Sequence, residues 1–378
     1  MQFRDALLLP HAGDGKGIGP SGLSHCGALM TLKSDPGNFF EDFTVGDELI
    51  HATPRTVTEA DAALYTGLTG SRYALYSADT FAQDCGLEGA PIDPLLAFHV
   101  VFGKTVPDIS LNAVANLGYA DGRFLKAVYP GDTLRAVSEV IGVKENSSGK
   151  TGVVWVRTTG FNQENEEVLT YVRWVMVNKK DTSKPAPVTV VPELPAAVRP
   201  QGLPKVEVSA AGYNFDLAGS PFGYEDYEIG EQINHVDAFT VEEAEHQIAT
   251  RLYQNTAKVH FNQHAQSQTP RGKRLIYGGV AISLARSIAF NGLANAAQII
   301  AINAGSHVNP LGSGDTVYAW SEVLDKAELG DGMGALRLRL VATKNRPCGD
   351  FPYKDPEGKY LPDVILDFDY WAAIPNRE

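Results

Sequence analysis

Residues 56–60 read Thr-Val-Thr-Glu-Ala, and 184 residues further on, residues 240–244 read Thr-Val-Glu-Glu-Ala. Two more pairs of stretches match in the same order at almost the same offset. They are Phe40-Glu41-Asp42-Phe43 with Tyr224-Glu225-Asp226-Tyr227, and Gly131-Asp132-Thr133-Leu134 with Gly314-Asp315-Thr316-Val317. Chance accounts for any one match, but three matches in order predict that a single module was duplicated along the chain.

Two helices are expected in each copy. The Thr-x-x-Glu pattern is a capping box, in which the Thr side chain accepts from a backbone N–H and the Glu reaches back to the cap. We therefore expect helices to begin near Thr56 and near Thr240. A second helical stretch, Gly278–Ala289, is rich in small residues that let a sheet approach closely, and Leu95–Gly103 takes its place in the first copy.

The end of each copy is predicted to form strands. Val153–Phe161 and Val168–Val177 are rich in Val, Trp and Tyr on either side of a polar turn, which is typical of a hairpin. In the second copy, apolar and charged residues alternate, which indicates one buried and one wet face. The apolar positions are Leu336, Leu338, Leu340, Leu366, Phe368 and Tyr370, and the charged ones are Arg337, Arg339, Asp367 and Asp369. We expect an α+β fold in which a curled antiparallel sheet wraps one central helix, twice over.

Prolines mark the boundary between the copies. Residues 184–204 contain six of them, and proline fixes φ and lacks the N–H that a strand ladder needs. This composition indicates an extended linker, and the repeat on either side disfavours a surface loop within one domain. The predicted organisation is a poorly ordered N-terminal extension over residues 1–37, a first module over 38–180, a linker over 181–212 and a second module over 213–378.

The composition is ordinary for a soluble globular protein, with 44% hydrophobic and 20% charged residues. The net charge of −13 argues against nucleic acid or an anionic membrane as a partner, because both bind basic surfaces. No apolar run of about 18 residues is present to span a bilayer. The three cysteines are too far apart for a disulfide framework or a metal knuckle, which fits a cytoplasmic protein.

One stretch carries the clearest chemical pattern. Tyr253–Ala265 reads Tyr-Gln-Asn-Thr-Ala-Lys-Val-His-Phe-Asn-Gln-His-Ala, with Asn255 five residues before His260. The hallmark of the MaoC-like dehydratases is Asp-x-Asn-Pro-x-His, followed by a turn into the central helix of a hot-dog fold. Here Asn255 and His260 stand in the Asp and His positions, and Leu275–Gly279 stands at the turn. From about Asn38 onward, the chain resembles a tandem hot-dog protein of this group.

Longer runs in residues 38–180 resemble one family within that group, the mesaconyl-CoA hydratases, also called β-methylmalyl-CoA dehydratases. The runs are Asn38–Phe43, His51–Thr56, Phe98–Asn112 and Tyr171–Val177. The resemblance implies a hydro-lyase that interconverts (2R,3S)-β-methylmalyl-CoA with mesaconyl-C1-CoA and water. It also implies a CoA-thioester substrate, no metal or redox cofactor, and either a homodimer or a monomeric double hot dog.

Hydration of an enoyl thioester needs a base for water, an acid for the α-carbon and donors for the enolate oxygen. We expect His260 to move the proton, because imidazole titrates near neutral pH. We expect Asn255 to position water, because a carboxamide cannot accept a proton. The amide of Gly279, at the start of the central helix, is expected to hold the thioester oxygen, and Ser283 is expected to add a hydroxyl.

The first copy lacks this pair of residues. Ser71 and Tyr76 stand at the positions equivalent to Asn255 and His260. We therefore expect the first copy to shape the acyl pocket, with His99 and Asp93 as outside candidates for the site.

Substrate binding requires cations on an otherwise acidic protein. A basic cluster before the turn is predicted to cradle the CoA phosphates, although a solvated loop is an equally good interpretation. A free substrate carboxylate needs a further cation. The predicted substrate-binding residues are Arg271, Lys273, Arg274, Tyr277 and Arg72, with Arg55 as an open alternative to Arg72.

Other interpretations of the same residues exist. His260 and His264, four residues apart, could be two ligands of a metal site, but no third ligand is placed and hydration needs none. Hot dogs also host thioesterases, and fold alone does not exclude that chemistry. A hydratase for another acyl chain and a non-catalytic module that binds CoA thioesters are the remaining alternatives, the last because the Asp of the hallmark is missing.

Overall fold

The computed structural model describes residues 33–377 of the chain. Its contacts separate the unit Met1–Pro36 from the unit Gly37–Glu378, and the elements below belong to the second unit. Most of the predicted N-terminal extension, residues 1–32, lies outside the described residues. None of the helices within residues 33–377 is long and apolar enough to cross a membrane.

The unit Gly37–Glu378 contains the same order of elements twice: a strand, a helix, a central helix and four strands, with short helices between them. In the first copy these are β1 (Glu48–Thr56), α1 (Glu59–Thr69), α2 (Asp79–Asp84), the central α3 (Pro94–Thr105), β2 (Ala113–Phe124), β3 (Thr133–Glu145), β4 (Thr151–Phe161) and β5 (Glu167–Asn178). In the second copy they are α4 (Phe215–Ala218), β6 (Gln232–Thr240), α5 (Glu243–Leu252), α6 (Lys258–Phe261), α7 (Gln263–Ser267), the central α8 (Gly278–Ile288), α9 (Phe290–Leu293), β7 (Gln298–His307), β8 (Thr316–Gly330), β9 (Met333–Lys344) and β10 (Val364–Pro375).

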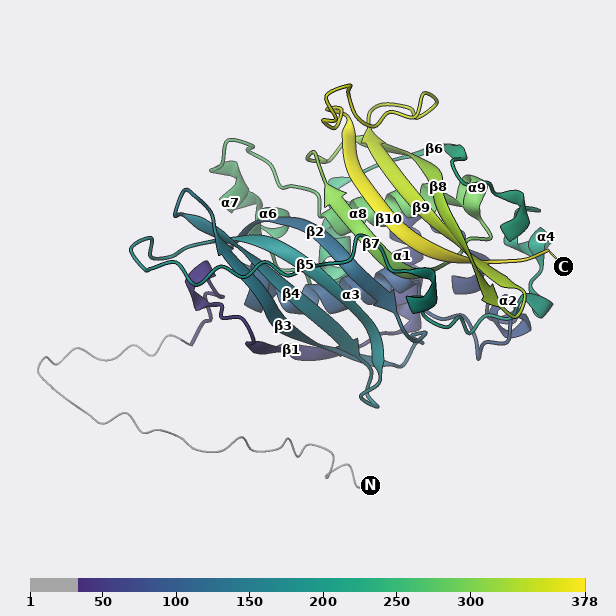
Figure 1. Cartoon of the computed structure of the whole chain (residues 1–378), viewed down its shortest axis with the longest axis horizontal. Coiled ribbons are helices and arrows are strands. Elements are labelled where there is room, and N and C mark those ends of the chain that lie inside the picture. Colours follow the sequence, from purple (N-terminus) through teal and green to yellow (C-terminus); the bar gives the residue numbers. More distant parts are fainter. Residues whose placement is uncertain (1–32, 378) are drawn as a thin grey trace, which may run out of the picture. The chain divides into compact units, whose positions relative to one another are not determined.

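All ten strands join one antiparallel sheet, in the order β1-β3-β4-β5-β2-β7-β10-β9-β8-β6 (Figure 1). The two halves of this order mirror each other, so β2 and β7 meet at the junction between the copies. Across the junction, Tyr119 pairs with Gly305 and Arg123 pairs with Ala301. Each copy therefore wraps its own central helix, as predicted, but the two sheets are continuous.

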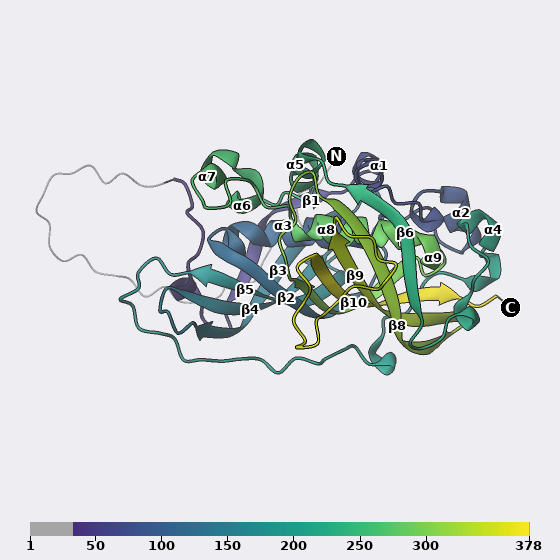
Figure 2. The same cartoon turned by 90° about the horizontal axis from the view of Figure 1, so that it is seen from above.

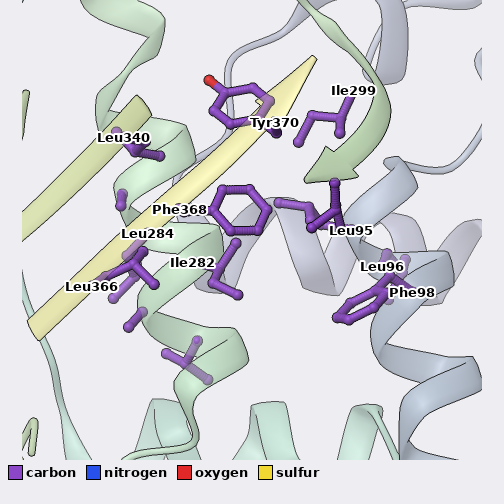
Figure 3. Packing of buried hydrophobic residues seen from close by; sticks show 14 of the residues in the cluster. Leu95, Leu96, Phe98, Ile282, Leu284, Ile299, Leu340, Leu366, Phe368 and Tyr370 are labelled. Atoms are coloured by element: carbon purple, nitrogen blue, oxygen red, sulfur yellow. The ribbon is translucent and has the colours of Figure 1, made fainter. Parts of the chain in front are cut away.

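The core is also continuous across the two copies. Figure 2 shows the helices along one side of the sheet and residues 181–212 along the other. Leu95 and Phe98 of α3, Ile282 of α8 and Phe368 of β10 belong to one buried apolar cluster (Figure 3). Fully burying such a side chain stabilises a fold by about 1.5–3 kcal/mol. Both central helices therefore pack into one shared cluster, and each copy adds a smaller buried cluster of its own, around Phe40 and Val154 in the first and around Trp320 and Val341 in the second.

Strand predictions near the end of the chain are confirmed, including the alternation of charged residues. On the face opposite the core, Arg337 of β9 lies 2.6 Å from Asp369 of β10, and Arg339 lies 3.6 Å from Asp367. Cross-strand pairs of this kind contribute roughly 0.2–1 kcal/mol each.

The predicted capping boxes are wrong in their residues. The cap of α1 is Thr58, whose box is completed by Asp61, and no side chain caps α5. Thr56 and Thr240 end β1 and β6 instead, where each hydroxyl bonds a threonine of the neighbouring strand at 2.7 and 2.8 Å. The repeated threonines therefore close strand ends, and the helices begin just after them.

The proline-rich residues between the copies are attached to the outer face of the sheet. Val190 forms a bridge with Val143 of β3. Further along, the N–H of Val198 donates to Oδ1 of Asn303 at 2.8 Å, and its carbonyl accepts from Nε1 of Trp371 at 3.0 Å. The segment thus contacts strands of both copies.

Candidate active site

A cavity of about 510 Å³ lies between the two copies. The second copy contributes α6, Arg271, residues 275–278 and the residues that follow β7. The first copy contributes the end of α3, the π-helical turn Val106–Ser110, and parts of β2 and β5. This volume is in the usual range for small-molecule sites, about 300–1,000 Å³, and its wall is built from both copies.

His260 lines this cavity from α6, a single helical turn. Its Nδ1 lies 2.8 Å from the carbonyl oxygen of Leu275. A carbonyl only accepts, so Nδ1 carries the proton and Nε2 keeps its lone pair. The N–H of Leu275 in turn donates to the carbonyl of Val259 at 3.0 Å, which ties α6 to the loop before α8. The fold thus selects the tautomer in which Nε2 is the basic nitrogen.

The start of α8 meets the cavity at Gly278. The first amides of a helix have no partner within it and lie at the positive end of its dipole. Just before them, the N–H of Tyr277 donates to Nε2 of buried His246 at 2.9 Å, which fixes the turn. A Cβ on Gly278 would collide with the ring of His307, and one on Gly279 would collide with the ring of Tyr277. Glycine at both positions therefore allows these rings to pack against the helix start.

Asn255 also lines the cavity and is 1% exposed. Its N–H donates to the carbonyl of Thr250 at 2.9 Å, and its Oδ1 accepts from the N–H of Ala257 at 3.1 Å. Because Oδ1 is engaged within its own loop, Nδ2 is the polar group that this side chain offers to a water or a substrate. An amide can hold water but cannot take its proton.

An imidazole with a basic Nε2 and the start of a helix at one cavity can move a proton beside a developing oxyanion. The sequence profile of the mesaconyl-CoA hydratases matches residues 30–347. The chain belongs to the mesaconyl-CoA hydratase family. Its relatives carry hydratase or dehydratase names, so this family member is a hydro-lyase.

Two curated relatives cover nearly the whole chain. A β-methylmalyl-CoA dehydratase from Chloroflexus aurantiacus is 61% identical over 351 residues, which are 92% of this chain and 100% of that protein. A mesaconyl-CoA hydratase from Cereibacter sphaeroides is 60% identical over 349 residues, which are 91% of this chain and 100% of that protein.

Solved structures confirm the predicted α+β double hot-dog fold of this family member. A protein described as a MaoC domain dehydratase from Chloroflexus aurantiacus has a TM-score of 0.90 at 61% identity, and the match covers 92% of this chain and 100% of that one. A Mycobacterium tuberculosis protein with a double hot-dog fold has a TM-score of 0.71 at 25% identity, over 90% of this chain and 98% of that one.

In this member of the mesaconyl-CoA hydratase family, the start of α3 differs from the start of α8. Asp93 stands where Tyr277 caps α8, and its Oδ1 accepts from the second amide of α3 at 2.8 Å. Pro94 takes the place of Gly278 and has no N–H. Tyr76, at the position equivalent to His260, donates its phenol to a backbone carbonyl. The cavity beside these residues measures only about 40 Å³, so the first copy lacks both the donors and the space.

The structure divides the predicted basic cluster. Arg271 is exposed and lines the cavity, at its open rim. Lys273 is exposed but does not line the cavity. Arg274 forms an ion pair with Glu243 at 2.7 Å. Only the first of the three is therefore placed to meet a ligand that enters this cavity.

Two other predicted site residues lie away from the cavity. Ser283 is buried between the central helices, where its Oγ is 2.9 Å from both Nε2 of His99 and the phenol of Tyr65. Arg72 lies on the surface, over the ring of Phe290, and half of its side chain is exposed. Tyr277, by contrast, lines the cavity as predicted for a substrate-binding residue, and its buried hydroxyl has no partner among the described residues.

Sequence reasoning missed several cavity residues, among them three with a basic side chain. Lys258 is exposed at the rim, on the same turn as His260. His307 ends β7, and its buried Nε2 has no hydrogen-bond partner in the described part of the chain. Arg173 reaches the cavity from β5 in the other copy. Of these three residues, only Arg173 could have been noticed from the sequence. The residues two before and two after it are apolar strand residues, so the pattern places Arg173 on their face of the strand.

We expect the hydration activity to fall only at strongly acid pH, where His260 becomes protonated and can no longer act as the base. Burial lowers the pKa of His260 to about 4, and the hydrogen bond to the Leu275 carbonyl offsets part of this effect. The imidazole is therefore unprotonated, and able to accept a proton, above that pH. The profile of kcat/KM should be level from pH 8 to about 5 and should fall about tenfold per pH unit below about 4. An acid limb centred near the ordinary histidine pKa of about 6.5 would contradict this assignment.

Acid unfolding must be separated from this titration. Burial also lowers the pKa of His99 and His246 to about 3 and that of His235 and His307 to about 4. An unfolded histidine binds a proton near pH 6.5 and these folded ones do not, so stability should fall as the pH drops from about 6.5 to 4. Enzyme held at each pH and then assayed at neutral pH measures the loss through unfolding alone.

Proposed function

We propose that the chain catalyses the reversible addition of water to mesaconyl-C1-CoA, giving (2R,3S)-β-methylmalyl-CoA. The observation that carries the proposal is that His260, whose Nε2 is the basic nitrogen, and Gly278, the first residue of α8, line one cavity, while Gly279 follows directly behind its lining. Support for the substrate comes from two relatives at 60–61% identity whose names contain β-methylmalyl-CoA and mesaconyl-CoA.

In the proposed mechanism, the N–H groups of Gly278 and Gly279 hold the thioester oxygen. Asn255 positions a water, and Nε2 of His260 takes one of its protons as the water oxygen bonds to C3. The π electrons of the C2=C3 bond move toward the thioester and form an enolate. His260 then returns the proton to C2, which completes the addition of one water. Losing one donor to such an oxyanion typically costs about 3–4 kcal/mol of transition-state stabilisation.

The rim of the cavity is proposed to bind the CoA phosphates through Lys258 and Arg271. Changing both to Gln should raise KM for CoA thioesters by about three- to tenfold at low salt, since exposed ion pairs contribute about 0.2–1 kcal/mol each. The effect should shrink as the salt concentration rises, because exposed charges are screened. Steady-state kinetics at two ionic strengths measures it.

The matched control is Lys273→Gln, which removes an exposed cation that does not line the cavity and should leave KM unchanged. A pantetheine thioester lacks the phosphates of CoA, and the double variant should use it as well as the wild type does. Equal losses on both thioesters would refute phosphate binding at this rim.

Incubation of the purified protein with mesaconyl-C1-CoA, and separately with mesaconyl-C4-CoA, tests the proposed function. Hydration predicts loss of enoyl absorbance and a gain of the mass of one water for the C1 ester, with the thioester intact. Release of free thiol would identify a thioesterase instead. Binding without turnover of either ester would identify a non-catalytic module.

A further inference from the structure

Arg173 is a buried cation that has no counter-charge among residues 33–377. Its side chain on β5 is 0% exposed, and no carboxylate of the described residues lies within ion-pair distance of it. Its Nη2 donates to Oγ1 of Thr105 at 2.7 Å, and Ser110 Oγ lies 3.4 Å from both terminal nitrogens. Its Nε has no partner among those residues. A buried charge that lacks a counter-charge is costly, so a bound anion here would be strongly favoured.

Polar groups of the first copy surround this guanidinium in the cavity. Tyr119 stands directly opposite Arg173 in the pairing of β2 with β5, so their side chains share one face of the sheet. The phenol of Tyr119 and both amide atoms of Asn116 are buried without hydrogen-bond partners in the described structure. All three residues line the 510 Å³ cavity. Native proteins seldom leave buried polar atoms unpaired, so a cluster of them points to a ligand.

A row of rings connects this cluster to the catalytic groups. The guanidinium lies 4.2 Å from the ring centre of Phe102, which lies 5.6 Å from that of Tyr277. The ring of Tyr277 lies 5.4 Å from that of His260. All four residues line the same cavity. Arg173 and His260 therefore face one ligand space from different copies.

We propose that Arg173, with Tyr119 and Asn116, binds the free carboxylate of a dicarboxylic acyl-CoA thioester and so selects it over monocarboxylic thioesters. The inference rests on the proposed function for the class of substrate. A planar guanidinium suits a carboxylate because it donates two parallel hydrogen bonds. The rigid trans double bond of mesaconate sets its two carboxyl carbons at opposite ends, which matches an anion site and an oxyanion site in one cavity.

The two arginines that the sequence suggested for this role are engaged elsewhere. Arg55 forms an ion pair with Asp61 and donates to the carbonyl of Leu252, and it does not line the cavity. Arg286, a second buried arginine that forms no ion pair within the described residues, donates to the carbonyls of Ala296 and Ala297 and also lies outside the cavity. Arg173 thus differs from a purely structural buried arginine by facing the ligand space.

Binding of two unreactive thioesters tests the inference without turnover. Isothermal titration should show that the wild type binds succinyl-CoA at least about 30-fold more tightly than butyryl-CoA. Butyryl-CoA has no free carboxylate, so it would leave the buried charge of Arg173 unpaired, which is costly. In Arg173→Met the preference should fall to about threefold or less. A wild type without the preference, or a folded Arg173→Met that keeps it, would overturn the proposal.

A milder variant covers the case in which Arg173→Met fails to fold. Tyr119→Phe removes one hydroxyl and should lower the preference by about three- to tenfold, the usual net worth of a single hydrogen bond. Tyr171→Phe is the matched control, because Tyr171 is buried on the same strand as Arg173 but does not line the cavity. It should leave the preference unchanged; equal effects of the two variants would overturn the proposal. Hydration of mesaconyl-C1-CoA by the wild type is scored separately, so the proposed function can fail while the carboxylate site stands.

Discussion

Replacing His260 by Ala should reduce kcat/KM for hydration of mesaconyl-C1-CoA by a factor of about 10³–10⁴, the upper part of the range for a general acid–base residue. The large effect follows from the absence of a substitute in its own loop, since Asn255 cannot accept a proton. Binding should change far less, because Nδ1 of His260 holds a backbone carbonyl and Nε2 meets the water. Steady-state kinetics, with titration of succinyl-CoA as a measure of binding, distinguishes the two effects.

His307 provides the control for this prediction. It is the other imidazole that lines the cavity, and its ring packs against Gly278. Within the described part of the chain, no hydrogen bond from its Nδ1 to a carbonyl is seen that would make its Nε2 the basic nitrogen, as the bond to the Leu275 carbonyl does for His260. We expect His307→Gln to lower kcat/KM by about tenfold or less, as for loss of a positioning contact. If His307→Gln abolished hydration and His260→Ala did not, the base would have to be reassigned to His307.

Much of the fold could be predicted because its signals are local. The repeated Thr-Val stretches identified two copies, and alternating residues located β9 and β10. The junction between the copies could not be predicted in this way. Tyr119 and Gly305 pair across β2 and β7 although 186 residues separate them, and no property of either strand names the other as its neighbour. The single sheet, and the cavity between the copies, follow from that pairing.

In the candidate site too, the residues that are close together in the sequence could be predicted, and those contributed by the other copy could not. Asn255, His260 and the glycine turn lie within 25 residues of one another in the sequence, so a motif was enough to find them. Much of the cavity wall from the first copy lies in the runs Phe98–Asn112 and Tyr171–Val177, which carry the family resemblance, but no chemical pattern marked their residues as part of a site. Arg173 was the exception, because Tyr171 and Val175 flank it at the spacing of one strand face and both are buried. A charge on such a face needs a partner, which the sequence did not reveal.

The second large effect is expected for Gly103→Ala, on the central helix of the first copy. Gly103 lies on α3, and a Cβ there would fall well inside the van der Waals radius of the Tyr253 carbonyl oxygen. Beside it, Lys104 Nζ donates to Oε1 of Gln254 at 3.2 Å. These contacts hold the backbone that leads directly into Asn255. The variant should lose about 1–3 kcal/mol of unfolding free energy from overpacking, and a loop shift of about 1 Å should lower kcat about 10²-fold.

Gly67→Ala is the matched control, because Gly67 lies on α1 of the same copy with no atom near its missing Cβ. Alanine is favoured over glycine in a helix by about 1 kcal/mol, so this variant should unfold at the same or a higher temperature with full activity. Gly103 does not line the cavity, so its loss of kcat cannot come from a lost substrate contact. A folded Gly103→Ala with wild-type kcat would mean that the catalytic loop is positioned without α3. The expected loss of kcat in Gly103→Ala would show that the first copy contributes to catalysis although it has no site of its own. Its central helix, α3, would set the position of the loop that carries Asn255.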